Sequence, residues 1–568
     1  MGDEWYMMRG IFILILTLIC PFIVGFGGIV DGRGLSEQIG ELIAIRLQSA
    51  SPIEICLVGK EAVCNSNLLT LFYRDRGYLP AWSTDHGVLP IAGELYEAIR
   101  KADLEGLRPE DYHAEKLKDI FSRLSEEQAS NRVAVTQLFA DLDLLCTDAF
   151  LTYASHLSGG KINPETVDPE WGHQRSDIDP VNILRQALAT GHVSLALNNV
   201  APTQAGYFLL KKELVRYRDI GARGGWPQIV GGGNLKKGVR DSRVIALRRR
   251  LSISGELATE AEIDIDLVDD NVSEAISNFQ QRHGLEVDGI VGPATLAVLN
   301  VSIQQRINQI ETNLERYRWL PRSHDRRHLI VNIADYMLEV VEDDEVVMEM
   351  RVIVGMNYRR TPQFNGKMTY LVFCPYWYIP YKVAVEDKLP LIRVNPGYLV
   401  EHNMQVFDGV GNDAEEVDPS LIDWSQLNGK NFTYNIRQAP GPANALGRVK
   451  FMFPNKYNVY LHDTSSRELF NRRVRTFSSG CIRVEKPLQL AEYVLRNDPK
   501  WSRENILAAV NAWKEQTVTL PEAIAVSLIY RTAWVDKNNV LQFRNDVYGR
   551  DELLGERLRE GYRLPEQK

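Results

Sequence analysis

A cysteine, a histidine and an arginine lie close together in the segment 460–487. Cys481 directly follows Gly480 and lies nineteen residues after His462, and Arg483 is two positions further on. A cysteine attacks as its thiolate, so a catalytic cysteine needs a nearby imidazole to accept its proton. A glycine before the nucleophile permits a tight turn whose backbone N–H groups can stabilise an oxyanion. The segment therefore supplies a nucleophile, a base and an oxyanion turn; on spacing alone, a buried and inert cysteine is the alternative.

The order of residues in this segment resembles a known family signature. His462, fifteen residues, Ser478, one residue and then Gly-Cys-Ile-Arg is similar to the signature of L,D-transpeptidases, the cysteine enzymes with a YkuD-type catalytic domain that cross-link peptidoglycan. Other segments that resemble this family are 328–362, 371–380, 440–451 and 532–535. The resemblance is to the large, YcbB-like branch of Gram-negative bacteria and extends over nearly the whole chain. Many members have a histidine where this chain has Ser479.

The resemblance implies roles for the catalytic residues. Cys481 is expected to be the nucleophile and His462 the general base. A backbone carbonyl just after the histidine is expected to orient the imidazole. The carboxylate of Asp463 is not expected to do so, because neighbouring residues of a strand point to opposite faces. The oxyanion is expected to bind backbone N–H groups around Gly480 and Cys481.

Five further residues are candidates for contact with the substrate. Arg483 suits a carboxylate of the peptide stem, and a salt bridge to Glu485 is the structural alternative. Tyr460 lies two residues before the catalytic histidine, hence on the same face of the strand, and can border the cleft. Trp377, together with its neighbour Tyr378, could form a wall of the substrate site, with aromatic core packing as an equal alternative. Ser478 belongs to the signature itself and is counted among the residues expected to serve the oxyanion or the substrate.

The resemblance also implies the reaction. The thiolate would attack the carbonyl of residue three of a tetrapeptide stem and release the terminal D-alanine, and a neighbouring stem would resolve the thioester to leave a 3→3 cross-link. Peptidoglycan tetrapeptide stems are thus the expected donor and acceptor, other cell-wall enzymes are possible partners, no metal or other cofactor is expected, and carbapenems are the expected inhibitors. Hydrolysis by an L,D-carboxypeptidase and transfer to a D-amino acid or a lipoprotein lysine are alternatives. A wall-binding scaffold with an idle catalytic domain is a third, disfavoured by the intact signature.

Length, charge and cysteine content restrict the class of protein. A chain of 568 residues exceeds what one hydrophobic core usually organises. The net charge of −9 is mild and there is no long basic block, which argues against nucleic acid as a partner. The six cysteines contain no CxxC pair, so a zinc site is not expected. Cys56 and Cys64 could pair or remain free, and Cys374, with no histidine beside it, is interpreted as incidental.

The first residues, 1–30, are expected to be a targeting segment. Residues 10–30 carry no charge and are preceded by Arg9. This stretch is longer than the apolar centre of most signal peptides and close to the length of a membrane span, so both a cleaved signal and an uncleaved anchor to the inner membrane stay open. Either form implies export, and the resemblance implies the periplasm.

Residues 36–220 are predicted to form a helical scaffold domain. Apolar residues recur there at spacings of three and four, which is typical of packed helices. Asp141 and Asp143 could suggest paired catalytic carboxylates. A solvated helix face or local capping explains these two acids more simply.

The remainder is predicted to contain two further domains, which gives an α+β multidomain fold. Residues 238–300 resemble a small three-helix peptidoglycan-binding domain, because they end in D-G-I-V-G-P-A-T. Residues 325–550 are rich in β-branched residues with hairpin turns and are predicted to be the β-rich catalytic domain. An insertion at 382–438 resembles the family's capping subdomain over the cleft, with an ordinary surface helix as the alternative. Residues 551–568 are predicted to be a C-terminal tail.

Overall fold

The structure is a computed structural model that describes residues 33–49, 57–58, 61–126, 132–173, 178–258, 265–322, 325–395, 397–409 and 414–561. The predicted targeting segment 1–30 lies outside the described residues, and so does Cys56, whose pairing with Cys64 the sequence leaves open. Within the described ranges, no helix has both the length and the apolar character that a membrane span requires.

The N-terminal half is a helical domain built around one long helix. Its helices are α1 (Leu35–Ser49), α2 (Ser66–Asp75), α3 (Pro90–Arg100), α4 (Ala114–Glu126), α5 (Arg132–Gly159), α6 (Pro180–Thr190), α7 (Val193–Val200) and α8 (Ala205–Ala222). Two short hairpins accompany them: β1 (Leu57–Val58) with β2 (Glu61–Ala62), and β3 (Ser83–Thr84) with β4 (Gly87–Val88). Most of α5 is buried, because α1, α2, α3, α4, α6 and α7 all pack around it.

A small unit of three helices follows. It consists of α9 (Arg243–Ser254), α10 (Asp270–Arg282) and α11 (Pro293–Leu299), which share a core of their own that includes Leu247 and Phe279. Asp269 caps α10 by accepting a hydrogen bond from the backbone N–H of Val272 at 2.9 Å. Pro293 occupies the first turn of α11, where a missing N–H costs nothing. The predicted three-helix unit is present.

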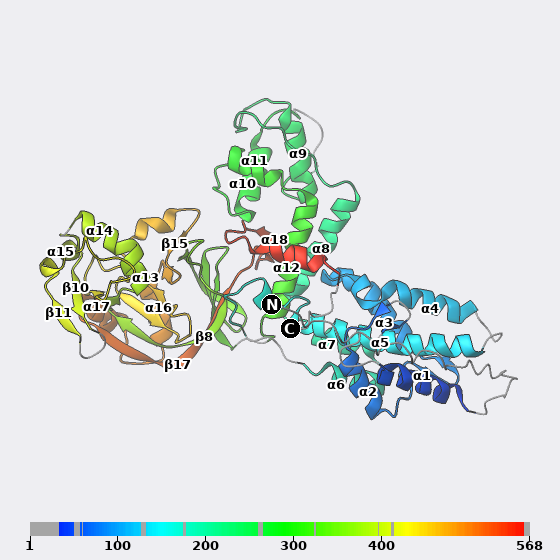
Figure 1. The fold of residues 1–568 in the computed structure, drawn as a ribbon. Helices are drawn as coiled ribbons and strands as arrows, with labels where there is room; N and C mark the ends of the chain where they lie inside the picture. The colour runs from blue at the N-terminus through cyan, green and yellow to red at the C-terminus, as the bar shows by residue number, and fades with distance from the viewer. Residues whose placement is uncertain are drawn as a thin grey trace, which may run out of the picture.

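The helix α12 (Ile303–Trp319) connects the domains. It packs against α8, α5 and α18 (Arg550–Arg559). Figure 1 shows α12 in the middle of the molecule, with the helical domain on one side and the β-rich domain on the other. The region predicted as a C-terminal tail thus contains most of α18, whose Leu554 is buried. The hairpin of β18 (Ala533–Val535) and β19 (Leu541–Phe543) also lies against α12 and α8.

The domain that the sequence predicts to be catalytic is a nine-stranded sheet that closes on itself. Its strands are β5 (Arg327–Asn332), β6 (Met337–Glu342), β7 (Glu345–Gly355), β8 (Phe364–Phe373), β13 (Val449–Met452), β14 (Leu461–His462), β15 (Thr476–Ser478), β16 (Ile482–Val484) and β17 (Gln516–Ile529). Their order is β15-β7-β16-β14-β13-β8-β17-β5-β6, and β6 also pairs with β7. That last pairing closes the sheet into a ring and leaves only the short strand β15 at an edge among the described strands. The helices α16 (Pro487–Leu495) and α17 (Arg503–Asn511) contribute to its core.

The insertion between β8 and β13 is a separate subdomain rather than one surface helix. Its strands are ordered β11-β10-β12-β9: β9 (Trp377–Tyr378), β10 (Met404–Asp408), β11 (Glu415–Val417) and β12 (Asn435–Gln438). Its helices are α13 (Tyr381–Val383), α14 (Leu389–Val394) and α15 (Tyr398–Glu401). These elements enclose their own apolar core, which includes Ile392 and Val406. We call residues 377–438 the cap. The predicted α+β multidomain class is confirmed.

Candidate active site

The pairing of two short strands brings the cysteine and the histidine together. The strands β14 and β16 are parallel neighbours, with His462 opposite Arg483. Cys481 comes directly before β16, and the N–H of the next residue, Ile482, donates to the carbonyl of Tyr460 at 3.1 Å. The pairing therefore places His462, on β14, near Cys481, which directly precedes β16, although nineteen positions separate them in the chain.

The turn before the cysteine is held by hydroxyl groups. Gly480 has a φ of 113°, a conformation that side chains disfavour. Its N–H donates to Ser478 Oγ at 3.1 Å, and Ser478 Oγ donates to the carbonyl of Cys481 at 2.5 Å. Thr361 Oγ1 donates to the carbonyl of Gly480 at 2.8 Å. Ser478 is buried and its hydroxyl is engaged inside this turn, so it shapes the nucleophile loop rather than facing the cleft.

His462 is buried and oriented by the backbone. Its Nδ1 lies 2.5 Å from the carbonyl oxygen of Asp463. Burial lowers the pKa of the imidazole to about 3, and the positive charges of Arg483 and Lys450 act in the same direction. The ring is therefore neutral near pH 7, with Nε2 able to accept a proton. The carboxylate of Asp463 instead accepts hydrogen bonds from the N–H of Arg448 at 2.9 Å and from Arg467 at 3.1 Å.

The thiol of Cys481 is in its protonated form at rest. It donates to the carbonyl of Asn458 with an Sγ–O distance of 3.7 Å. Burial raises the pKa of this thiol, although hydrogen bonds from Tyr460 and the charges of Lys450 and Arg483 oppose the rise. A thiol with a raised pKa requires a base for attack at neutral pH, which is the function that the neutral His462 can supply. The other candidate, Cys374, is buried and donates to the carbonyl of Val510 at 3.3 Å.

Lys450 is a site residue that the sequence analysis missed. It lies on β13 opposite His462, and its amine is 4.0 Å from the ring centroid of Tyr460. The Tyr460 ring in turn meets the His462 ring edge-on at 5.6 Å between centroids. Burial lowers the pKa of Lys450, and the neighbouring Cys481 raises it. The alternation of side chains along β13 could have indicated Lys450, but only if the pairing of β13 with β14 had been known.

Arg483 is not paired with Glu485, the acid named as its structural alternative. Glu485 is bound by Arg351, with Nε–Oε1 at 3.0 Å. Burial lowers the pKa of Arg483, and the acid whose charge raises it is Glu468. Nε of Arg483 is buried and has no hydrogen-bond partner among the described residues. The guanidinium of Arg483, whose charge acts on the Cys481 thiol, is a candidate to bind an anionic group of a substrate.

Trp377 belongs to the cap. It lies on β9 opposite Gln438 and packs partly against the cap core. The amine of Lys388 lies 5.4 Å from its ring centroid. These contacts agree with the aromatic-packing alternative, because the tryptophan packs against the core of the cap.

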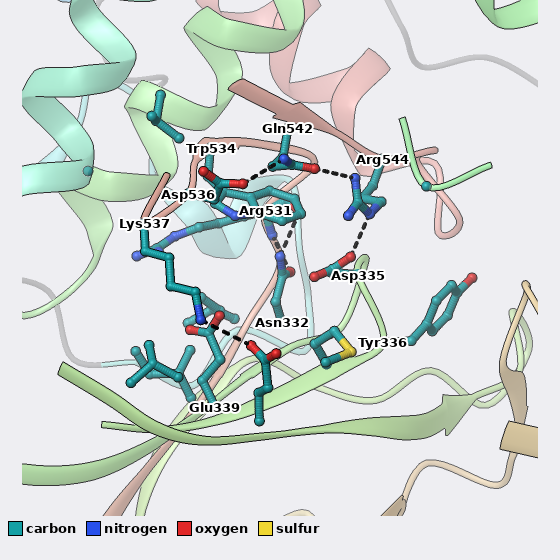
Figure 2. A pocket seen from close by; sticks show the side chains of 18 of the residues that line it. Asn332, Asp335, Tyr336, Glu339, Arg531, Trp534, Asp536, Lys537, Gln542 and Arg544 are labelled. Atoms are coloured by element: carbon teal, nitrogen blue, oxygen red, sulfur yellow. Dashed lines mark hydrogen bonds and ion pairs between the residues drawn. The ribbon is translucent and has the colours of Figure 1, made fainter. Parts of the chain in front are cut away.

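A cavity of about 1470 Å³ lies elsewhere, between the start of α8, the end of α10, strands β5 and β6 and the β18–β19 hairpin. Figure 2 shows Glu339, Arg531 and Trp534 among its lining residues. None of the predicted site residues lines it, so it is distinct from the Cys481 site. Among the described residues, no group of three or more His, Cys, Asp or Glu side chains could hold a metal ion.

Three family models match the chain. A scaffold domain matches residues 67–214, a "Putative peptidoglycan binding domain" matches 240–299, and an L,D-transpeptidase catalytic domain matches 326–501. A curated protein of Haemophilus influenzae named "Putative L,D-transpeptidase" is 39% identical over 246 residues, which is 43% of this chain and 48% of that protein. The chain thus matches about half the length of this relative.

Two solved structures are also similar. An L,D-transpeptidase of Xylanimonas cellulosilytica is 18% identical and covers 53% of this chain and 99% of its own, with a TM-score of 0.16. An L,D-transpeptidase of Stackebrandtia nassauensis is 12% identical and covers 53% of this chain and 96% of its own, with a TM-score of 0.20.

The family match at 326–501 includes His462 on β14 and Cys481 directly before the paired strand β16, and it identifies an L,D-transpeptidase catalytic domain of the YkuD type. With further matches to a scaffold domain and to a peptidoglycan-binding domain, the chain is similar in its domain order to the YcbB-like L,D-transpeptidases.

Proposed function

We propose that this chain forms 3→3 cross-links between peptidoglycan stem peptides through a thioester on Cys481. The observation that carries the proposal is the placement of a neutral His462, oriented by the Asp463 carbonyl, on the strand beside the thiol. This pair supplies a base and a nucleophile without a metal or a nucleotide.

The first half of the reaction forms the acyl-enzyme. Nε2 of His462 takes the thiol proton, and Sγ attacks the carbonyl carbon of the third stem residue. The N–H of Gly480 is engaged with Ser478, so we assign the N–H of Cys481 as an oxyanion donor. Collapse of the tetrahedral intermediate breaks the peptide bond, and D-alanine leaves with the proton held by His462.

The second half resolves the thioester. The side-chain amine of a neighbouring stem attacks the carbonyl, His462 accepts a proton from that amine, and the C–S bond breaks. The thiolate is then reprotonated by the imidazolium. The donor's own peptide bond thus drives the new bond, so neither half requires ATP.

Two cations flank the site and suit the anionic groups of a stem peptide. Arg483, with its unpartnered Nε, and Lys450 both lie near the thiol and oppose the rise of its pKa. A guanidinium binds a carboxylate through two parallel hydrogen bonds, so we assign Arg483 to a stem carboxylate. Lys450 contributes a second positive charge to the same cleft.

Hydrolysis is the second candidate, because water in place of the amine would give an L,D-carboxypeptidase from the same acyl-enzyme. A D-amino acid or a lipoprotein lysine as the acceptor would use the same first half. We place the reaction in the periplasm, on the strength of the charge-free segment 10–30 and of peptidoglycan as the substrate.

The test is incubation of the purified chain with disaccharide-tetrapeptide, beside a Cys481→Ala control, with products analysed by mass spectrometry. A dimer that has lost one D-alanine, absent from the control, is the expected result. Tripeptide without dimer would instead establish the carboxypeptidase. Turnover that persists in Cys481→Ala would overturn the assignment of the nucleophile.

A further inference from the structure

An arginine in the β7–β8 connection joins the cap to the nucleophile turn. Nη1 and Nη2 of Arg359 bind the two carboxylate oxygens of Asp387 at 2.5 and 2.9 Å, and Nη2 also binds Glu386 at 2.6 Å. Nη1 donates to Ser479 Oγ at 3.0 Å. One guanidinium therefore contacts two acids of the cap and the residue two positions before Cys481.

The catalytic-domain end of this contact is rigidly attached to the nucleophile turn. The N–H of Met356 donates to the carbonyl of Ser478 at 2.9 Å, and Thr361 Oγ1 accepts from Gly355 N–H at 2.9 Å while donating to the carbonyl of Gly480. The connection that carries Arg359 and the turn that carries Cys481 therefore move as one unit.

The cap end is equally well anchored. Glu386 and Asp387 lie in a single π-helical turn, Ala384–Lys388, a geometry that is rare and is often found at functional sites. Ala384 is buried in the cap core, and the Lys388 amine donates to the Tyr398 hydroxyl at 3.0 Å. The two acids thus follow any movement of the cap.

The contact has the geometry of a strong ion pair. The side chain of Arg359 is only 7% exposed, whereas Glu386 and Asp387 are 46% and 38% exposed. Paired hydrogen bonds to one carboxylate fix the direction of approach as well as the distance. The cap has its own apolar core, separate from that of the sheet. The contact of Arg359 with Glu386 and Asp387 can therefore break without exposing either core.

We propose that Arg359 is a positioning residue that latches the cap over the nucleophile turn, with Ser479 as the hydroxyl that fixes the latch to that turn. The latch controls the access of stem peptides to Cys481, and this part rests on the proposed transpeptidase function. The hydroxyl contact also assigns a role to Ser479, the position at which the chain departs from the common Ser-His-Gly-Cys pattern.

Access to the thiol can be measured without any substrate. Iodoacetamide would be reacted with the full chain, and alkylation of the peptide that contains Cys481 would be followed by mass spectrometry. Arg359→Ala and Asp387→Asn are each expected to accelerate alkylation about 3- to 10-fold. The double variant is expected to react no faster than Arg359→Ala alone, because that change already removes every contact of the guanidinium with the cap.

A matched control is available at the turn between β6 and β7. Arg326 and Asp343 form an ion pair of similar geometry, with Nε–Oδ1 at 2.5 Å and Nη2–Oδ2 at 2.8 Å, and both are exposed. Arg326→Ala should leave the alkylation rate unchanged. If Arg359→Ala does not fold, as judged by circular dichroism, Asp387→Asn carries the same test from the more exposed partner.

Kinetics on the tetrapeptide donor provide the second measurement. Arg359→Ala, which removes the latch, is expected to raise the donor KM several-fold with a smaller change in kcat. Arg359→Lys is expected to recover part of this loss. Ser479→Ala is expected to raise KM in the same direction but by less. Wild-type alkylation rates in both Arg359→Ala and Asp387→Asn, or additive effects in the double variant, would overturn the latch. Absence of dimer from the unmodified chain would count against the proposed function alone, because the alkylation result does not depend on turnover.

Discussion

Nδ1 of His462 lies 2.5 Å from the backbone carbonyl oxygen of Asp463, the next residue in the chain. A carbonyl oxygen can only accept, so Nδ1 carries the ring hydrogen and Nε2 is left with a free lone pair. The base is therefore oriented by a group that no side-chain substitution removes and that does not titrate. In this respect the site differs from triads in which a carboxylate holds the histidine.

The first prediction concerns Asp463 and follows from this arrangement. Asp463→Asn should retain kcat within about threefold, because the carboxylate faces Arg448 and Arg467 and not the imidazole. His462→Ala should lose about 10²- to 10⁴-fold in kcat, the usual contribution of a general base. Steady-state rates of D-alanine release would measure both. A loss in Asp463→Asn comparable to that in His462→Ala, with the fold intact, would contradict backbone orientation of the ring.

The second prediction concerns the pH dependence of the thiol. The pKa of Cys481 is raised, while that of His462 is lowered to about 3. The resting pair is therefore thiol and imidazole, and iodoacetamide should react faster as the pH rises, with no inflection near 6.5. A preformed thiolate–imidazolium pair would instead give fast alkylation that persists to acidic pH.

The same lowered pKa has a consequence for stability. The unfolded chain binds the His462 proton near pH 6.5, but the folded chain does so only near pH 3. Protonation below about pH 6.5 thus favours the unfolded state, and this histidine lowers the free energy of unfolding as the pH falls from 6.5 towards 3. His462→Gln should weaken that acid dependence in urea titrations at pH 4.5 and 7.5.

The third prediction separates two arginines on adjacent strands. Arg483→Ala should raise the donor KM about tenfold or more, because the substrate carboxylate loses its guanidinium partner, and Arg483→Lys should recover part of the loss. Arg351→Ala is the control: it removes the partner of Glu485 and should lower stability with little change in KM. Equal effects of the two alanine variants on KM would contradict a substrate role for Arg483.

The catalytic motif could be recognised from sequence because its residues are close together in the chain and their types are chemically distinctive. The order His462, Gly480, Cys481 needed only a turn and two short strands to become a site. Lys450 and Arg359 could not be recognised in the same way. Their importance depends on the pairing of β13 with β14 and on the position of the cap, which are contacts between distant segments.

The sequence interpretation of Asp143 was wrong for a related reason. A helix with polar residues at intervals predicts a solvated face, but α5 is surrounded by other helices and Asp143 is fully buried. Its carboxylate accepts from the N–H groups of Ala81 and Trp82 at 2.6 and 3.1 Å and from the Tyr73 hydroxyl at 2.9 Å. A buried acceptor of this kind ties a loop to a helix and leaves no periodic signal in sequence.

The fourth prediction uses Asp143 to test the helical domain. Asp143→Ala should lower the free energy of unfolding by about 3 kcal/mol or more, because it leaves buried N–H donors without an acceptor. Asp141→Ala is the matched control on the same helix: Asp141 pairs with Arg46 near the surface at 2.6 Å, and its loss should cost about 1 kcal/mol or less. Urea unfolding followed by circular dichroism would measure both, and activity of the folded fraction should be unchanged.

The pH dependence of the Asp143 effect has a definite sign. Burial raises the pKa of this carboxyl from 3.8 to about 6, so the folded state favours the protonated form. As the pH rises from about 4 through 6, ionisation reduces the contribution of Asp143 to stability, and the difference between Asp143→Ala and the parent chain should shrink over that interval. A difference that instead grows with pH would show that the hydrogen bonds from Ala81, Trp82 and Tyr73 to the ionised carboxylate outweigh the cost of its burial.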